Sequence, residues 1–242
     1  MRILVVNPNT TASMTKTIEA AATSAAAKGT MIEATTSGMG PVSIEGYYDE
    51  VFAMPGLLAE IRRGEAGGAQ AAVIACFDDT GLDAARSMAS IPVIGICEAA
   101  LTLASFVASR FTVVTTSERS RVPVEELVRR YGFASRAKVR VAGVPVLALE
   151  DPTSGAVARL KVEIARALDD DHAEAIVLGC AGMADLAAEL AAMHGLPVID
   201  GVTAAVTLAE ALVRLGLKTS RLGPYAVPRS KPYDGLLSQF RP

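Results

Sequence analysis

Two short apolar runs, far apart in the chain, each end in a cysteine that is followed by turn residues. The first is Gln70 to Asp79, which reads Gln-Ala-Ala-Val-Ile-Ala-Cys-Phe-Asp-Asp, and the second is Glu174 to Met183, which reads Glu-Ala-Ile-Val-Leu-Gly-Cys-Ala-Gly-Met. In each run the apolar residues predict a buried strand, and a helix-like segment follows the turn. The chain is therefore expected to place one thiol, Cys76 or Cys180, at the end of each of two strands.

A second pair of segments repeats at almost the same separation. The cysteines are 104 residues apart, and Pro92 and Pro197 are 105 residues apart. Ile-Pro-Val-Ile-Gly-Ile-Cys-Glu-Ala-Ala, ending at Ala100, aligns without gaps with Leu-Pro-Val-Ile-Asp-Gly-Val-Thr-Ala-Ala, ending at Ala205. Similar offsets at two independent motifs indicate a duplicated structural unit.

Strand-like and helix-like patterns alternate along the whole chain. Such alternation predicts parallel β-α-β units with right-handed crossovers and helices on both sheet faces. We predict strands over 2–6, 31–36, the run ending at 76, 91–94, 111–115, 139–141, the run ending at 180 and 197–199. We predict helices over 12–27, up to 64, 82–88, 98–108, up to 131, 151–168, 183–193 and 202–215.

Some connections between these elements carry predictions of their own. Thr11 is placed to cap the helix that follows it, and the long stretch from 37 to 50 has the length of a functional loop. The residues from Gly223 onward are rich in Pro, Gly and charged side chains, which predicts an irregular tail.

The predicted fold class is α/β, with two pseudo-symmetric lobes that each hold a small parallel sheet. We expect residues 1–97 plus 206–242 to form the first lobe and residues 98–205 to form the second. The carboxyl ends of both sets of strands would then face one cleft, which is where ligands of open α/β sheets usually bind. Both cysteines would line this cleft.

Thiols at such positions lie near backbone N–H groups and a helix start, which favour the thiolate over a free pKa of about 8.5. If two such thiols face each other across a small molecule, one as thiolate can remove a proton from a carbon while the other, as thiol, returns a proton on the opposite face, which gives the mirror image. The two groups must be of one type because their roles exchange with the hand of the substrate. Donors for the enolate oxygen would be the N–H groups after each cysteine and the side chains of Asn7 and Thr116.

Structural roles compete with these assignments. Free cysteine is often a buried core residue, and only the matched positions of Cys76 and Cys180 favour a functional pair. Cys97 is interpreted as helix packing, and His172 and His194 as solvated surface residues. Other polar residues have local roles open to them: Asp78 and Asp79 either cap the next helix or polarise the site, and Asn7 and Asn9 also suit turns.

Composition excludes several classes of function. The 23 Lys and Arg are scattered against 26 Asp and Glu, so we expect no nucleic-acid partner. The apolar run near the start, Ile3 to Val6, is too short for a signal peptide, and no later segment is apolar over the length of a membrane span. These features predict a cytoplasmic protein with no membrane association. Three cysteines fit a reducing compartment, and two isolated histidines give a metal site little support.

Taken together, these residues resemble the hydantoin and allantoin racemases of the aspartate/glutamate racemase superfamily over nearly the whole chain. The resemblance rests on six segments, none of which is specific alone. They are Arg2-Ile-Leu-Val-Val-Asn-Pro-Asn-Thr-Thr11, Gly40-Pro-Val-Ser-Ile-Glu-Gly46, Ala75-Cys-Phe-Asp-Asp-Thr-Gly-Leu-Asp83, Pro92-Val-Ile-Gly-Ile-Cys-Glu-Ala-Ala100, Val113-Val-Thr-Thr116 and Ile176-Val-Leu-Gly-Cys-Ala-Gly-Met183.

The resemblance implies two flavodoxin-like lobes, a homo-oligomer, and racemisation of a small-molecule substrate, a 5-substituted hydantoin or allantoin, without cofactor or metal. It implies a catalytic pair at Cys76 and Cys180. It also implies that the substrate contacts the second lobe and the residues beside each thiol. The binding residues would be Asn7, Ile44, Phe77, Thr116, Ser117, Ala181 and Gly182.

Two departures from the family pattern bear on specificity. Thr80 stands where these sequences often have proline, and Ala181-Gly182 follows the second cysteine where glutamate racemases tend to have Thr-His. The missing histidine fits a hydantoin, whose ring-activated proton is more acidic than that of an amino acid.

Several other readings stay open. The scaffold does not fix the reaction, so amino-acid racemisation, maleate isomerisation and arylmalonate decarboxylation are alternatives within the superfamily. The retained pair of thiols argues against the single-thiol decarboxylase, and the few cations near the strand ends, Arg119 and Arg121, argue against an isomerase of a dianion. A non-catalytic ligand-binding protein is the alternative from another class.

Overall fold

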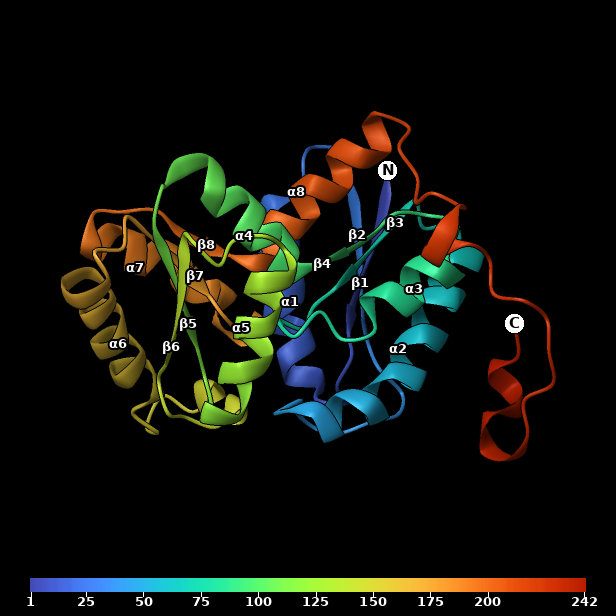
Figure 1. Cartoon of the computed structure of the whole chain (residues 1–242), viewed down its shortest axis with the longest axis horizontal. Helices are drawn as coiled ribbons and strands as arrows, with labels where there is room; N and C mark the ends of the chain where they lie inside the picture. Colours follow the sequence, from blue (N-terminus) through green and yellow to red (C-terminus); the bar gives the residue numbers. More distant parts are fainter.

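The computed structural model describes residues 1–242 and contains two four-stranded parallel sheets that lie side by side (Figure 1). The first sheet has the order β2-β1-β3-β4 and the second the order β6-β5-β7-β8. The predicted α/β class with two parallel sheets is thereby confirmed. The strands are β1 Arg2–Asn7, β2 Met31–Thr36, β3 Ala71–Ile74, β4 Val93–Gly95, β5 Phe111–Thr115, β6 Ala137–Val141, β7 Ala175–Leu178 and β8 Val198–Asp200.

Helices connect successive strands and cover both faces of each sheet (Figure 1). The α-helices are α1 Ala12–Ala25, α2 Tyr47–Ala66, α3 Leu82–Met88, α4 Ile96–Val107, α5 Arg121–Arg130, α6 Ala156–Asp171, α7 Ala187–His194 and α8 Gly201–Arg214. Short 3-10 helices are η1 Glu118–Ser120, η2 Val146–Glu150, η3 Ala181–Leu186, η4 Gly223–Tyr225 and η5 Gly235–Phe240.

Alternation along the strands divides the apolar core into three parts. Side chains of a strand point to opposite faces in turn, so Ile3 and Val5 of β1 enter one cluster while Leu4 and Val6 enter another. The largest cluster takes buried residues from both sheets and from α1, α4 and α8. Helix α8 packs against both α1 and α4. The largest of the three clusters therefore joins the two sheets.

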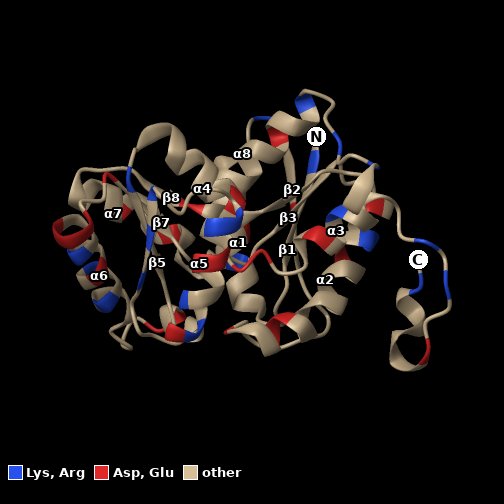
Figure 2. Ribbon diagram, viewed as in Figure 1, with Lys and Arg blue, Asp and Glu red and all other residues tan.

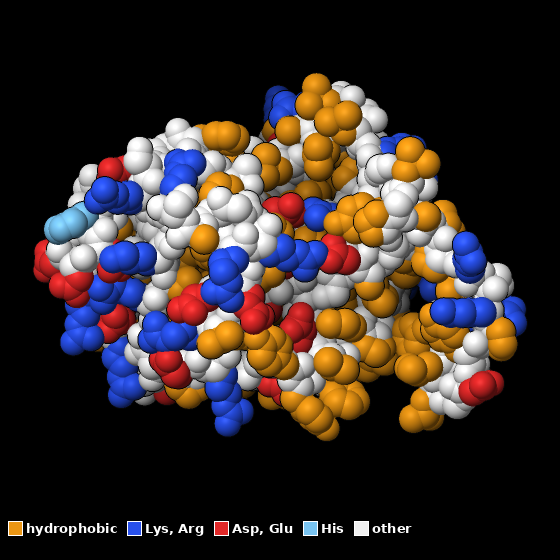
Figure 3. Space-filling view, in the orientation of Figure 1, with side chains coloured by type: hydrophobic (Ala, Val, Ile, Leu, Met, Phe, Trp, Pro, Cys, Tyr) orange, Lys and Arg blue, Asp and Glu red, His pale blue; other side chains and the backbone are white.

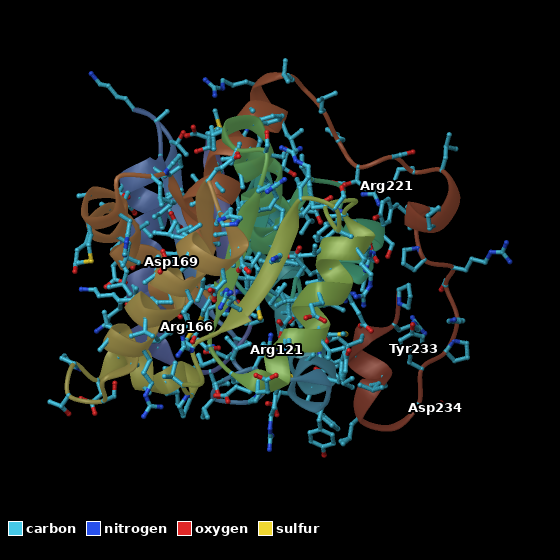
Figure 4. The ribbon with its side chains drawn as sticks, turned by 60° about the vertical axis from the view of Figure 1, so that its left-hand side comes forward. Arg121, Arg166, Asp169, Arg221, Tyr233 and Asp234 are labelled. Carbon is cyan, nitrogen blue, oxygen red and sulfur yellow. The ribbon has the colours of Figure 1, made fainter.

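The last helix, α8, returns to the first sheet. It packs against α1 and α4 and also contacts β3 and β4. The partition into lobes of 1–97 plus 206–242 and 98–205 remains a prediction. Beyond α8 the tail runs along α3, where the Arg221 guanidinium donates a hydrogen bond to the carbonyl of Ser87 at 3.1 Å (Figure 4).

Two predicted helices begin later than expected. The helix predicted to start at Asp151 starts at Ala156, because Asp151 accepts the Thr153 N–H at 2.8 Å in a local turn and Gly155 adopts a left-handed conformation, with φ of 72°. The helix predicted over 183–193 begins as the 3-10 helix η3 and becomes α-helical only at Ala187.

Two local predictions about polar side chains are wrong. Thr11 does not cap α1, since its hydroxyl donates to the Val42 carbonyl at 2.7 Å and so fastens the 37–46 loop. His194 is not fully solvated, because its Nε2 atom is buried without a hydrogen-bond partner.

Charged side chains of both signs are interspersed over both lobes (Figures 2 and 3). No helix in the structure has the length and apolar composition needed to span a bilayer.

Candidate active site

The two thiols lie at equivalent positions in the two sheets. Cys76 comes two residues after β3 ends, and Cys180 comes two residues after β7 ends. Each of these strands is an inner strand of its sheet. Both cysteines line one narrow cleft of about 40 Å³, so the structure brings the predicted pair together.

Thirteen residues line this cleft, and none of them is Lys, Arg or His. Six of the nine predicted site residues are among them. The lining also includes residues that the sequence did not single out, above all Asn9 and Ser120. The predicted residues in the lining are Ile44, Cys76, Phe77, Thr116, Cys180 and Ala181.

Asn7 does not line the cleft. Its side chain is fully buried, and its Nδ2 group donates to Asn9 Oδ1 at 2.9 Å and to Thr15 Oγ1 at 3.0 Å. The amide is therefore engaged in holding the loop after β1. Asn9, two residues along the same Asn-Pro-Asn loop, faces the cleft instead, and its Nδ2 group contacts Met14 Sδ at 3.1 Å.

Ser117 and Gly182 also lie outside the lining. Ser117 is replaced there by Ser120, the last residue of η1, whose Oγ is 3.5 Å from that of Ser117. Gly182 lies behind the second thiol: a Cβ atom at this position would be 3.7 Å from Cys180 Sγ. Thr116 lines the cleft and is buried.

The turn after Cys76 is held by a long-range contact. The Asp79 N–H donates to the Cys76 carbonyl at 3.0 Å, and Asp79 itself has a left-handed φ of 46°. Its buried carboxylate accepts the N–H groups of Cys97 and Glu98 at 2.9 and 3.0 Å, at the start of α4. Tyr131 at the end of α5 donates its hydroxyl to the same carboxylate at 2.6 Å.

The sequence left open whether Asp79 caps the next helix or polarises the site. Asp79 caps a helix, but the helix is α4 rather than the next helix, α3. The N-cap residue of α4 is Gly95, and a Cβ there would lie 2.3 Å from Asp79 Oδ1. Glycine at this position is therefore what allows the carboxylate to reach the helix.

Burial dominates the electrostatics of both thiols. It raises the pKa of Cys76 well above the ordinary value, and the charge of Asp78 raises it further. Burial also raises the pKa of Cys180, to about 11, although the Gly182 N–H lowers it. The expectation that these positions favour the thiolate is wrong for the ligand-free cleft, because removal of the sulfur from water outweighs the nearby N–H groups.

The acidic residues beside Cys76 are themselves perturbed. Burial, together with the charges of Glu50 and Asp79, raises the pKa of Asp78 to about 7. Burial likewise raises the pKa of Asp79 to about 7, while Tyr131 and the two N–H groups at the start of α4 lower it. Asp78 lines both the thiol cleft and a neighbouring cavity of about 390 Å³ between α2, α3 and α5.

Backbone N–H groups treat the two thiols alike. The N–H two residues after each cysteine, that of Asp78 or of Gly182, lies close enough to lower the pKa of the sulfur.

No group of three His, Cys, Asp or Glu side chains has an arrangement that would hold a metal ion.

Comparison with known proteins shows to which family the chain belongs. Residues 3–209 match the family model described as Asp/Glu/Hydantoin racemase. The chain belongs to the Asp/Glu/hydantoin racemase family. The hydantoin racemase of Pseudomonas sp. strain NS671 is similar in sequence, with 50% identity over 242 residues. The match covers 99% of this chain and 97% of that protein.

Two further members of the Asp/Glu/hydantoin racemase family support the match over the full length. The hydantoin racemase of Rhizobium meliloti is 50% identical over 97% of this chain and 98% of that protein. The solved structure of an allantoin racemase from Klebsiella pneumoniae superposes with a TM-score of 0.97 at 46% identity, covering 100% of this chain and 99% of that one.

Proposed function

We propose that the protein is a cofactor-independent racemase of 5-substituted hydantoins or allantoin, in which Cys76 and Cys180 exchange protons with opposite faces of one ring carbon. The observation that carries the proposal is that both sulfurs line a single narrow cleft at the carboxyl ends of the two sheets. The named activities of relatives at 50% identity indicate the substrate class.

The reaction conserves protons within the pair. One cysteine, as thiolate, takes the proton from C5 of the ring, and the electron pair of that C–H bond moves into the enolate of the neighbouring carbonyl. The other cysteine, as thiol, gives its proton to C5 from the opposite face. The product has the opposite configuration, and the two cysteines have exchanged protonation states.

The enolate needs hydrogen-bond donors near the thiols. We assign this role to the backbone N–H groups after each cysteine, to the Thr116 hydroxyl and, in place of Asn7, to the Asn9 amide. Thr116 and Asn9 support this because both line the cleft.

A neutral ring suits the charges around the cleft. The lining contains no cation, and Arg121, one of the two arginines near the strand ends, points its guanidinium to the Glu118 carboxylate at 3.0 Å (Figure 4). A dianionic substrate would find no positive partner in the lining, whereas an uncharged hydantoin or allantoin needs none. The C5–H of such a ring is more acidic than the corresponding C–H of an amino acid, so its removal needs less assistance. A site that lacks the histidine found in glutamate racemases therefore suits this substrate.

The test is loss of optical rotation from single enantiomers of allantoin and of several 5-alkyl and 5-aryl hydantoins. We expect rotation to fall to zero and, in D₂O, one deuterium to appear at C5. Protein alkylated with iodoacetamide serves as the control for spontaneous racemisation. Equal rates with native and alkylated protein for every compound would refute the proposal.

We also propose that the protein is a homo-oligomer. Four large side chains on one stretch of α2 are exposed although they are apolar or aromatic: Tyr47, Tyr48, Val51 and Phe52. Burial of such a patch against another copy would remove it from water. Light scattering at two protein concentrations would reveal the mass, and a monomeric mass at both would refute the assignment.

A further inference from the structure

One buried hydroxyl beside the first thiol has no hydrogen-bond partner. Thr80 is fully buried, and its Oγ1 atom is shielded from solvent with neither a protein donor nor a protein acceptor in hydrogen-bonding geometry. A hydroxyl left unpaired in this way costs about 1–3 kcal/mol, so its retention calls for an explanation.

The hydroxyl lies next to Cys76. It is close enough to lower the pKa of the thiol, although in the ligand-free structure the pair does not meet the geometry of a full hydrogen bond. Thr80 is not among the residues that line the cleft. It therefore approaches the sulfur from the protein interior, and a substrate in the cleft would not displace it.

The turn that carries Thr80 is fixed on both sides. The Asp79 N–H donates to the Cys76 carbonyl at 3.0 Å, and the Leu82 N–H donates to the Asp79 carbonyl at 3.0 Å. The Asp79 carboxylate is tied to the start of α4 and to Tyr131. These hydrogen bonds hold the backbone on both sides of Thr80 in place.

The other groups around Cys76 oppose its ionisation. Asp78 on the same turn and Cys180 from the second lobe both raise its pKa, and the buried Cys97 of α4 faces the same cluster of charges. Only the Asp78 N–H and the Thr80 hydroxyl act in the other direction. A thiolate at Cys76 is a much stronger acceptor than the neutral thiol, so a donor is worth most in that state.

We propose that the Thr80 hydroxyl is a positioning donor, unpaired in the resting thiol form, that completes its hydrogen bond to Cys76 when this sulfur becomes a thiolate. The use of that thiolate in proton transfer rests on the proposed function, whereas the hydrogen bond does not. Cys180 has no equivalent group, since the residue four positions after it is Ala184.

The test compares Thr80→Val, which keeps the shape but removes the hydroxyl, with Thr80→Ser, which keeps the hydroxyl. Iodoacetamide alkylation of each cysteine is followed against pH by mass spectrometry of its peptide in the full-length protein. We expect Thr80→Val to raise the alkylation midpoint of Cys76 by about one pH unit, roughly a tenfold loss of thiolate at fixed pH, and to leave that of Cys180 in place. Thr80→Ser should stay near wild type.

Activity gives a second readout. At pH values below both thiol midpoints, kcat/KM should fall with the Cys76 thiolate population, roughly tenfold, in Thr80→Val. The change must be equal for both enantiomers, because the equilibrium constant between them is one. A purely structural role would change the unfolding midpoint in urea without moving either pH profile.

The outcomes separate this inference from the proposed function. An unchanged Cys76 midpoint in folded Thr80→Val, or an equal rise in Thr80→Ser, would overturn the role of the hydroxyl even if the protein racemises hydantoins. A shifted midpoint in a protein that racemises none of the tested compounds would support the hydrogen bond and refute the proposed function.

Discussion

The turns after β3 and β7 occupy the same place in the two sheets, yet they solve one problem differently. In each sheet the following strand leads into a helix, α4 or α8, and the first N–H groups of that helix need a hydrogen-bond acceptor. In the second lobe the N-cap residue Asp200 does this itself, accepting the N–H groups of Val202 and Thr203 at 2.9 Å each. In the first lobe the equivalent residue is Gly95, and Asp79 from the Cys76 turn supplies the carboxylate.

This difference decides the surroundings of each thiol. The Cys76 turn carries two carboxyl groups and is fastened to α4, whereas the Cys180 turn continues as Ala181-Gly182 and carries none. Burial and Asp78 accordingly raise the pKa of Cys76 well above its ordinary value, while that of Cys180 rises to about 11. The two thiols therefore have equivalent positions on the backbone but different surroundings. We expect Cys180 to ionise more readily than Cys76 in the ligand-free protein.

The strongest test of the pair replaces each thiol separately. Cys76→Ser and Cys180→Ser should each reduce racemisation by about 10²–10⁴-fold, because a positioned acid or base contributes rate factors of that size. Each variant should still exchange the C5 proton of one enantiomer for deuterium, and the two variants should prefer opposite enantiomers. The measurements are polarimetry and NMR in D₂O.

Full racemisation by either serine variant would show that a single thiol is sufficient. Deuterium exchange of the same enantiomer in both variants would show that the two sulfurs do not serve opposite faces. The Cys97→Ala variant is the matched control, since this cysteine is buried in α4 outside the cleft lining.

The two capping carboxylates can be compared directly. Asp79→Ala and Asp200→Ala each leave two helix N–H groups without an acceptor, so we expect each to lower the free energy of unfolding by about 2–4 kcal/mol. Only Asp79→Ala releases a thiol turn, and it should lower kcat about tenfold or more while Asp200→Ala stays close to wild type. Urea unfolding and steady-state kinetics at a temperature where both variants are folded test this. Equal losses of kcat would remove the functional distinction between the caps.

The charge of Asp78 should separate the two thiols further. Since it raises the pKa of both sulfurs, Asp78→Asn should lower both alkylation midpoints by about half to one pH unit. The larger shift is expected at Cys76, because Asp78 lies two residues after this cysteine on the same turn. The effect in wild type should develop as the pH rises through about 7, where Asp78 itself ionises. Unchanged midpoints would mean that solvent screens this carboxylate.

The smallest effect is expected at the hydroxyl that joins α5 to the Cys76 turn. Tyr131→Phe removes the 2.6 Å hydrogen bond to Asp79 and should cost about 1 kcal/mol of stability. The hydroxyl lowers the pKa of Asp79, so it stabilises the ionised carboxylate. The cost should therefore be larger above the Asp79 pKa of about 7 and smaller below it, which urea unfolding on each side of that pH would reveal. A pH-independent cost would contradict this assignment.

Much of the fold could be read from local patterns. Strands 31–36 and 111–115 and helix 82–88 have the predicted bounds, because period-two and period-3.6 apolar patterns, with glycine and proline between them, record burial directly. The alternation of strand-like and helix-like segments predicted the parallel topology, and the apolar runs that end at the cysteines placed both thiols at strand ends. These features depend on residues close together in the chain or on a repeat in the amino-acid sequence.

The site's finer geometry depends on contacts between distant segments. Asn9 and Ser120 face the cleft where Asn7 and Ser117 were expected, since packing against other elements decides which side of a loop turns inward. Asp79 caps a helix that begins 17 residues later in the chain, a contact that no local pattern contains.

The sequence by itself determined that two cysteines stand at the ends of two equivalent parallel strands. Only the tertiary structure decided how those cysteines differ, because a thiol's pKa sums desolvation and charge from several segments packed around it. That packing raised the pKa of both sulfurs where the local turn suggested a lower value, and it left the Thr80 hydroxyl beside only one of them.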